Sequence, residues 1–404
     1  MTGSFRFAYD PADLVYGRGC VDRLAESLAR SGSERALVVS GRTVGTTPSV
    51  VDPVTEGLGE RLAGVFAETT PDKRLRTAHE AAERVRSADV DALVALGGGS
   101  SLDIAAFAAI LAARGLGYEA ARDELVETGA MGIPDGVDLL PLFVVPTTLA
   151  GADLSVVAGV TDTHEGDLVR GMAFDGRLMP AAVHYDPALF ETTPHDVLRA
   201  SAMNGFDKGV EALYSAEATP VTDGTATRGL RLLRRGLPAL GRGERDEETL
   251  HDSIVGTMLV QYGFTRAVRA EERTATVSLV HAFGHGIARG YDIQQGGAHA
   301  IIAPHALAFL FDRVSAGRDL LAEALAVETA GRTDGEVADG IVEAVTEVRD
   351  ALGLPTRLRS IPDMTEADLP RVAESVHGDG LMAMTPEGFD PSVEEIESVL
   401  REAW

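Results

Sequence analysis

The residues that could do chemistry lie in two short segments in the second half of the chain. SAMNGFDKGVEALYS carries Asn204 and Lys208, and VHAFGHGIARGYDIQQ carries His281 and His285. Each pair has a spacing of four residues, which places both side chains on one face of a helix. An ammonium group can stabilise a developing negative charge, and an imidazole can donate a proton. The two segments together indicate an active site that combines charge stabilisation with proton transfer.

Lys208 is informative because lysine is so rare in this chain. The 404 residues include only two lysines, against 34 arginines. A surface cation in such a chain would be an arginine, so a lysine within this motif indicates a function. The structural alternative is an ion pair with Asp207 or Glu211 on the same helix.

The histidines allow three interpretations. His281 and His285 have the spacing of a metal-binding pair, of two groups that orient substrate and transfer a proton, or of two structural residues. We favour orientation and proton transfer. His299 and His305, further along, are expected to be structural or interface residues.

Two loops in the first half have the composition of a nucleotide site. Glycines after the apolar run DALVAL let a backbone approach a pyrophosphate, and a helix that starts at Ser100 or Ser101 offers free N–H groups. We expect Asp103 in the first turn of that helix. A tight turn without a ligand is the alternative. A second loop, PTTLAGAD, adds two hydroxyl groups after another apolar run. The predicted cofactor-binding residues of the two loops are Gly97, Gly98, Gly99, Ser100, Asp103, Thr147 and Thr148.

The elements that must position these residues are predicted to be alternating strands and helices in the first part of the chain and helices in the second. Short apolar runs alternate with helical patterns up to about Pro187, which predicts parallel strands covered by helices. The predicted strands cover residues 36–40, 91–99, 139–148 and 181–187. Later segments have helical spacing and no convincing strand. We predict an α/β Rossmann-like domain over residues 1–187 and an all-α domain over residues 188–404, packed closely together.

Composition excludes several classes of protein. The net charge is −26, which disfavours binding to nucleic acid or to an anionic membrane surface. Cys20 is the single cysteine, which fits a reducing cytoplasm, and no signal peptide or membrane span is visible. The acidic surface and the shortage of lysine favour adaptation to high salt, with a GC-rich genome as the alternative.

Taken in order, the motifs resemble those of the iron-containing (group III) alcohol dehydrogenase family, closest to its maleylacetate-reductase-like branch. The resembling segments are GGGSSLDIAA, PTTLAGAD, YDPALF, SAMNGFDKGVEALYS, the histidine segment through PHALAF, and GLPTRL. Three positions depart from the family pattern, with Ala106 for Lys, Ala152 for Ser and Asp153 for Glu. The resemblance implies a Rossmann-like domain, a helical domain, a nicotinamide cofactor between them and often a homodimer.

The resemblance also implies a divalent metal held by one Asp and three His, and here the pattern breaks. The four matching positions are Asn204, Lys208, His281 and Gln295. An ammonium repels a cation, and amide side chains are weak ligands for iron or zinc. We therefore expect no catalytic metal. His285 matches a family position associated with proton relay, so we rank it above His281.

The residues that follow the predicted strand at 36–40 bear on whether NAD or NADP is the cofactor. Many NAD-preferring relatives place an Asp at the position of Gly41, where its charge rejects a 2′-phosphate. Gly41 lacks that charge, and Arg42 beside it could pair with the phosphate or be an ordinary loop residue.

These inferences predict a cytoplasmic, metal-independent NAD(P)-dependent oxidoreductase that acts on a small carbonyl or alcohol. Lys208 would supply the positive charge and His285 the proton. An oxoacid substrate could be held by Lys208, Arg266, Arg269 or Arg273. Two alternatives stay open: a non-redox cyclase or lyase of the dehydroquinate-synthase-like superfamily, and a catalytically inactive nucleotide-binding protein.

Overall fold

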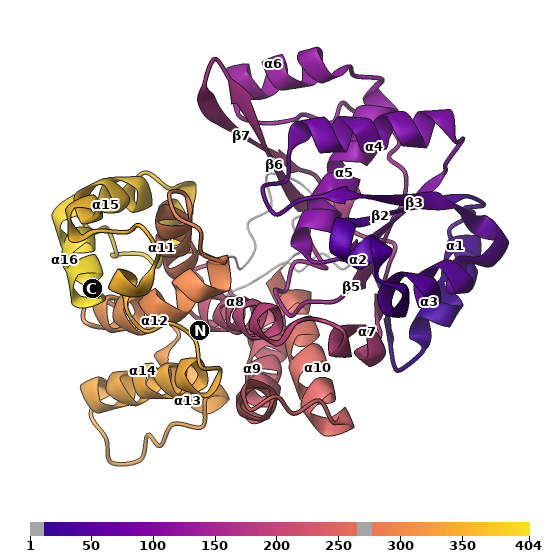
Figure 1. Ribbon diagram of the computed structural model, residues 1–404. Helices are drawn as coiled ribbons and strands as arrows, with labels where there is room; N and C mark the ends of the chain where they lie inside the picture. Colours follow the sequence, from indigo (N-terminus) through magenta and orange to yellow (C-terminus); the bar gives the residue numbers. More distant parts are fainter. Residues whose placement is uncertain (1–11, 265–276) are drawn as a thin grey trace.

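The structure is a computed structural model that describes residues 12–264 and 277–404. An α/β part comes first in the chain and a helical part follows it (Figure 1). Between Asp186 and the C-terminus the described residues form helices and loops without a strand. This arrangement confirms the predicted fold class. The division between residues 187 and 188 falls within the first turn of a short helix, and we retain it as a proposal.

The bounds of the elements are as follows. The strands are β1 Asp13–Tyr16, β2 Ala36–Gly41, β3 Leu62–Thr69, β4 Ala92–Gly97, β5 Leu142–Pro146, β6 Val157–His164, β7 Asp167–Phe174 and β8 Ala182–Tyr185. The α-helices are α1 Leu24–Arg30, α2 Arg42–Thr46, α3 Pro48–Leu58, α4 Leu75–Ser87, α5 Gly99–Arg114, α6 Tyr118–Thr128, α7 Pro187–Glu191, α8 His195–Tyr214, α9 Pro220–Gly241, α10 Glu247–Phe264, α11 Leu279–Ala288, α12 Gln295–Phe311, α13 Arg318–Ala324, α14 Asp334–Ala351, α15 Leu369–His377 and α16 Val393–Glu402. The short 3₁₀ helices are η1 Cys20–Arg23, η2 Gly59–Arg61, η3 Gly176–Leu178, η4 Leu358–Ser360, η5 Glu366–Asp368 and η6 Gly380–Met384.

Six parallel strands form the main sheet, in the order β1-β8-β5-β4-β2-β3. The four predicted strands correspond to β2, β4, β5 and β8. From β2 the chain continues to β3 at one edge of the sheet, whereas from β4 it continues to β5 on the side of the opposite edge. In open α/β sheets, a crevice opens at such a reversal, at the carboxyl ends of the strands. The sheet therefore directs the ends of β2 and β4 toward one ligand site.

Burial on both faces of the sheet explains why its central strands read as continuous apolar runs. Val38 and Val94 pack on one face against Leu24 and Val54 from α1 and α3. The opposite face belongs to a core that continues through α5 into α8 and α12 of the helical part. One hydrophobic core thus joins the two parts, and it fixes the sheet ends relative to the helical side chains.

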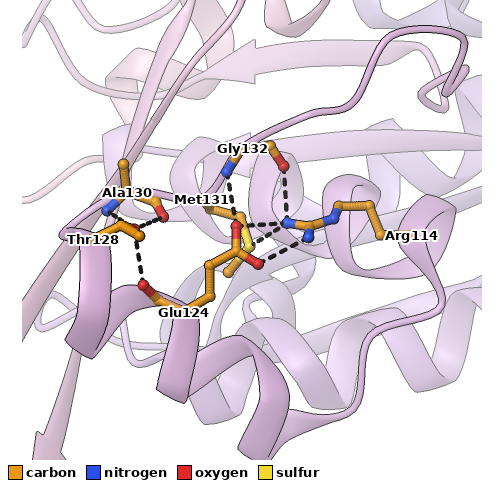
Figure 2. A network of polar contacts seen from close by, with 6 residues as sticks. All are labelled: Arg114, Glu124, Thr128, Ala130, Met131 and Gly132. Carbon is orange, nitrogen blue, oxygen red and sulfur yellow. Dashed lines mark hydrogen bonds and ion pairs between the residues drawn. The ribbon is translucent and has the colours of Figure 1, made fainter.

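A two-stranded antiparallel hairpin, β6 and β7, was not predicted. It projects from the sheet beside α6 (Figure 1) and pairs through an isolated bridge with Ala130. The segment around Ala130 is held by a polar network that joins α5 and α6 (Figure 2). Arg114 donates two hydrogen bonds of 2.8 Å to the Glu124 carboxylate, which accepts another from the Gly132 N–H at 3.0 Å. The network gives the hairpin a fixed partner at its edge.

No single helix of the described residues is long and apolar enough to cross a membrane. Only α5 and α6 taken together reach that length and composition, and they are bent by 110° relative to each other.

Candidate active site

The glycine turn after β4 allows the backbone of the turn and the neighbouring PTTLAGAD loop to approach each other closely. Gly97 ends the strand with a φ of 129°, which favours glycine. A side chain at Gly98 would meet Thr148 at 3.3 Å, and one at Gly99 would meet Ala152 at 3.2 Å. The glycine turn and the PTTLAGAD loop therefore pack against each other at the sheet crevice. The free N–H groups at the start of α5 suit a phosphate, so these residues fit a dinucleotide.

Helix α5 begins at Gly99, one to two residues before the predicted start. Asp103 consequently lies beyond the first turn, and the prediction that placed it there was wrong. Asp103 is nearly buried and forms an ion pair with Lys73. The charge of Asp103 raises the pKa of Lys73, against the effect of burial. The Lys73 ammonium is therefore held at the nucleotide turn.

Lys73 is the one site residue that sequence reasoning missed although a signal for it was available. It is the only lysine besides Lys208, so the rarity that singled out Lys208 applied equally to Lys73. Lys73 also has a positive φ of 52°, which non-glycine residues seldom adopt. Its carbonyl accepts a hydrogen bond of 2.9 Å from the Thr161 N–H of the hairpin, which holds the loop in place.

Lys208 lies on α8 and reaches across to the PTTLAGAD loop. Its ammonium donates a hydrogen bond to the carbonyl of Gly151, a residue with a φ of 67°. Burial lowers the pKa of Lys208 to about 8, and the charge of Asp153 opposes that shift. Burial in turn raises the pKa of Asp153 to about 6. The pair is thus a lysine and a carboxyl group that both titrate near neutral pH.

The structural alternative for Lys208, an ion pair with Asp207 or Glu211, is not what the structure shows, because both carboxylates lie against histidines. Glu211 contacts His281 Nδ1, and Asp207 Oδ2 lies 3.2 Å from His299 Nδ1. The cause is the direction of the side chains on α8. Both carboxylates are fully buried toward α11 and α12, whereas Lys208 is directed to the neighbouring loop.

His281 is held on both sides. Its Nδ1 contacts Glu211, and its Nε2 lies 3.1 Å from Asn204 Oδ1. Glu211 also accepts backbone N–H groups of Ser278 and Val280 at the start of α11, at 3.1 and 2.7 Å. Burial lowers the pKa of His281 well below its ordinary value. Asn204, His281 and Glu211 therefore form one buried chain that anchors α11 to α8.

His285 has a different environment, one turn further along α11. Its side chain is 37% exposed, and its Nδ1 lies 3.2 Å from Asp379 Oδ2. Asp379 also pairs with Arg289. Burial would raise the pKa of Asp379, but the hydrogen bond with His285 and the nearby charges lower it below its ordinary value. A carboxylate that orients a partly exposed imidazole is the arrangement of a positioned acid or base.

A cavity of about 520 Å³ lies between the hairpin side of the α/β part and helices α11 and α12, and among the groups described above Lys73 and His285 line it. Lys73 and hairpin residues line one side, and His285, Arg289 and Gln295 line the other. Gln295 starts α12, and the next residue, Gly296, packs so tightly on α8 that a side chain there would meet the backbone of Ala200 at 1.7 Å. The close approach brings Gln295 to the helix that carries Asn204 and Lys208.

The four positions at which the family binds its metal are thus brought to one region, but their chemistry does not fit iron or zinc. Lys208 is an ammonium donor, and both nitrogens of His281 are engaged by Glu211 and Asn204. In the described part of the chain, no three His, Cys, Asp or Glu side chains are placed to hold a metal ion. Gln295 adds only a neutral amide, which is a weak ligand.

The remaining predicted residues are placed as follows. Thr147 is buried and its N–H donates to the Gly97 carbonyl at 3.0 Å, while Ser100 lies in the first turn of α5. Gly41 ends β2, and Arg42 begins α2 with its guanidinium paired to Glu68. The possible anion-binding residues of the segment after α10 lie outside the described residues: Arg266, Arg269 and Arg273.

Comparisons with known proteins agree with this geometry. The profile of the iron-containing alcohol dehydrogenase family matches residues 11–187, and that of the Fe-containing alcohol dehydrogenase family, C-terminal part, matches residues 199–404. A maleylacetate reductase of Sphingobium indicum is 28% identical over 75% of each chain. The NAD-dependent methanol dehydrogenase of Bacillus methanolicus is 25% identical over 98% of this chain and 99% of its own.

Solved structures show the same fold. A 1,3-propanediol oxidoreductase has a TM-score of 0.85 at 23% identity, covering 98% of both chains. A sulfoacetaldehyde reductase from Bifidobacterium kashiwanohense, solved in complex with NAD⁺, has a TM-score of 0.83 at 17% identity, covering 99% of both. The resemblance that the motifs predicted, including its maleylacetate-reductase-like branch, is confirmed. The chain therefore belongs to the iron-containing alcohol dehydrogenase family and is a nicotinamide-dependent oxidoreductase.

Proposed function

We propose that this enzyme transfers a hydride between NAD(P) and a small carbonyl or alcohol substrate without a catalytic metal. The observation that carries the proposal is the ammonium of Lys208 in the family's metal region, next to the engaged pair of Asn204 and His281. A metal ion in that region would polarise the substrate oxygen. A buried ammonium can stabilise the same developing charge.

The cofactor would be held by the glycine turn and the PTTLAGAD loop. Gly98 and Gly99 let Thr148 and Ala152 of that loop pack against the turn, and the N–H groups at the start of α5 would bind the pyrophosphate. When bound, NAD(P) supplies or accepts the hydride. Gly41 and Arg42 at the end of β2 would face the adenosine ribose, and we propose that NADP(H) is accepted at least as well as NAD(H).

Each catalytic residue would have a distinct task. The Lys208 ammonium has three N–H donors and gives one to Gly151, so two remain for a substrate oxygen. His285 would donate the proton to that oxygen during reduction, oriented by Asp379. His281 and Asn204 would hold α11 and α8 in register.

We also propose a cytoplasmic enzyme that acts as a homodimer and binds neither nucleic acid nor a membrane surface. The single cysteine, Cys20, supports the cytoplasmic location, and the net charge of −26 disfavours nucleic acid and membrane surfaces. The homodimer rests on the family resemblance alone. The substrate would be a small carbonyl compound, with an oxoacid as the more specific proposal.

Turnover and metal content, measured on one preparation, test the proposal. Purified protein would be incubated with NADH or NADPH and a panel of aldehydes, ketones and oxoacids, and its metals measured by mass spectrometry. Cofactor oxidation without stoichiometric Fe, Zn or Mn, unaffected by a chelator, is the expected result. Stoichiometric metal with chelator-sensitive activity would contradict metal independence. Product without net cofactor oxidation would indicate a cyclase or lyase, and cofactor binding without turnover an inactive protein.

A further inference from the structure

The proposed mechanism leaves several charged residues of the cavity without a task. Lys73, Arg170 and Arg289 all line it, together with His285. Asp72 is the one acidic residue among the lining residues, and it is already bound to Thr70 and Arg74. An accumulation of basic groups in one cavity contrasts with a net charge of −26 for the whole chain. A cavity with such a lining attracts anions.

Arg170 is directed into the cavity by the register of the hairpin. Side chains alternate between the two faces of a strand. Gly171 and Ala173 are buried on one face of β7, whereas Arg170 and Met172 are exposed on the other. Arg170, Gly171 and Met172 all line the cavity. A side chain at Gly171 would meet Leu125 of α6 at 2.4 Å, so this strand cannot turn over. The sequence of β7 thus fixes which face carries the arginine.

The charges of the three basic residues are not equally compensated. Lys73 is paired with Asp103, and Arg289 with Asp379. No carboxylate of the described residues is paired with Arg170. Arg170 lines the cavity from the hairpin and Arg289 lines it from the end of α11. Partial burial and the charge of Arg289 lower the pKa of Arg170. Two guanidinium groups that line one cavity from different parts of the chain can bind one anion together.

The rest of this wall is apolar. Met172 is 53% exposed on β7, and Val160 and Ala288 line the cavity on its two sides. His285, the proposed proton donor, lines the same cavity. A ligand that suits this lining has a short apolar body, an end that reacts near His285 and an anionic end near Arg170.

We propose that Arg170 and Arg289 bind an anionic group of the substrate, a carboxylate in the first instance, at the end remote from the reacting carbon. This inference rests on the proposed function. The guanidinium fork matches a carboxylate in two parallel hydrogen bonds. Arg170 is then a specificity-determining residue. The hairpin that carries it is held in place by the packing of Gly171 against Leu125 and by the hydrogen bond of Thr161 to the Lys73 carbonyl.

Matched substrates test the proposal. The ratio of kcat/KM for 4-oxobutanoate to that for butanal reports on the carboxylate, since the two aldehydes have equal chain length. We expect wild type to favour 4-oxobutanoate, and Arg170→Met to lower the ratio about 10- to 100-fold, as for loss of a hydrogen bond to a charged group. Arg170→Glu should lower it further, and Arg170→Lys should restore part of it. Arg84→Met is the control, because Arg84 is an exposed arginine on α4 that does not line the cavity.

A binding measurement separates failure of this site from failure of the proposed function. Calorimetric titration of succinate into the enzyme with NAD(P)⁺ needs no turnover. Weaker succinate binding by Arg170→Met than by wild type would support the anion site. If no aldehyde were reduced in the same preparation, the proposed reaction would be rejected while the anion site stood. Titrations with ethanesulfonate and inorganic phosphate distinguish a carboxylate from the other oxyanions. Equal succinate affinity in wild type and Arg170→Met, or an unchanged substrate ratio in Arg170→Met and Arg170→Glu, would overturn the proposal.

Discussion

At the scale of single residues, Lys208 should contribute most to catalysis. If its ammonium stabilises the alkoxide, Lys208→Ala should lower kcat about 10²- to 10³-fold, as does the loss of an oxyanion donor. Lys208→Arg should recover only part of the rate, because the guanidinium is larger and planar. Space is also tight, since a Cβ atom added at Gly151 would lie only 3.3 Å from the Lys208 side chain. Steady-state kinetics at saturating substrate measure the effect. Near-normal turnover of Lys208→Ala would refute the assigned role.

The same lysine predicts a pH dependence. Burial lowers the pKa of Lys208 to about 8. Only the protonated form carries a positive charge, so kcat for reduction should fall as pH rises through about 8. The decline should be absent in Lys208→Arg, whose guanidinium stays charged. A pH profile of kcat for both proteins tests this, and a decline that persists unchanged in Lys208→Arg would assign it to another group.

The choice of cofactor should depend on one ion pair beside the nucleotide site. Arg42 was expected to bind a 2′-phosphate, but the structure pairs it with Glu68. Glu68→Gln should release the arginine and remove a repelling charge, so the ratio of kcat/KM for NADPH to that for NADH should rise. Arg42→Ala should raise the KM for NADPH and leave that for NADH unchanged. Glu56→Gln, at an exposed position on α3, is the control. A strong wild-type preference for NADH would contradict the proposed acceptance of NADP(H).

At the scale of elements, the network around Glu124 should stabilise the hairpin wall of the cavity. Hydrogen bonds from Arg114 hold the pKa of Glu124 below its ordinary value, so its contribution to the free energy of unfolding is present above pH 4.5 and lost as pH falls. Glu124→Ala should cost about 1–3 kcal/mol near pH 7. Denaturant unfolding should show this difference shrinking at low pH. Glu119→Ala, which removes a largely exposed partner of Arg122, should cost much less.

The burial of each strand explains whether it could be predicted from the sequence. The central strands β4 and β5 are buried along their whole length, so each appears as an apolar run between polar segments. The edge strands β1 and β3 have few buried residues and lack that pattern. The hairpin was missed for a related reason, because apolar side chains such as Met172 lie on its exposed face.

The site could be predicted only as far as local motifs reach. The two loops and the positions of Asn204, Lys208 and His285 follow from short segments. The partners of these residues come from far along the chain, as when His285 meets Asp379, 94 residues away. No local spacing indicates such contacts, because they depend on how α11 packs against the C-terminal helices.

At the scale of the whole molecule, the charge should make stability depend on salt. The 62 acidic residues outnumber the 36 basic ones, and their mutual repulsion is screened as ionic strength rises. We expect the melting temperature to increase from dilute buffer to molar KCl. Thermal melting followed by circular dichroism measures this, with sucrose at equal osmolality as the control. A melting temperature independent of KCl would leave a GC-rich genome as the better explanation of the composition.

The placement of Lys73 near the nucleotide turn and of Lys208 against the PTTLAGAD loop has a practical consequence. Lys73 and Lys208 hold every side-chain amine of the sequence, so an acylating reagent that would modify many lysines of an ordinary enzyme finds lysine targets at these two positions alone, besides an α-amino group. The Lys73 side chain is 38% exposed and accessible to reagent, but its ion pair with Asp103 keeps it protonated. Lys208 has the lower pKa, about 8, but is buried against Gly151, so raising the pH should be needed to label Lys73. Bound nucleotide should protect both. A fluorophore coupled to Lys73 would then report occupancy of the cleft directly, with no engineered cysteine.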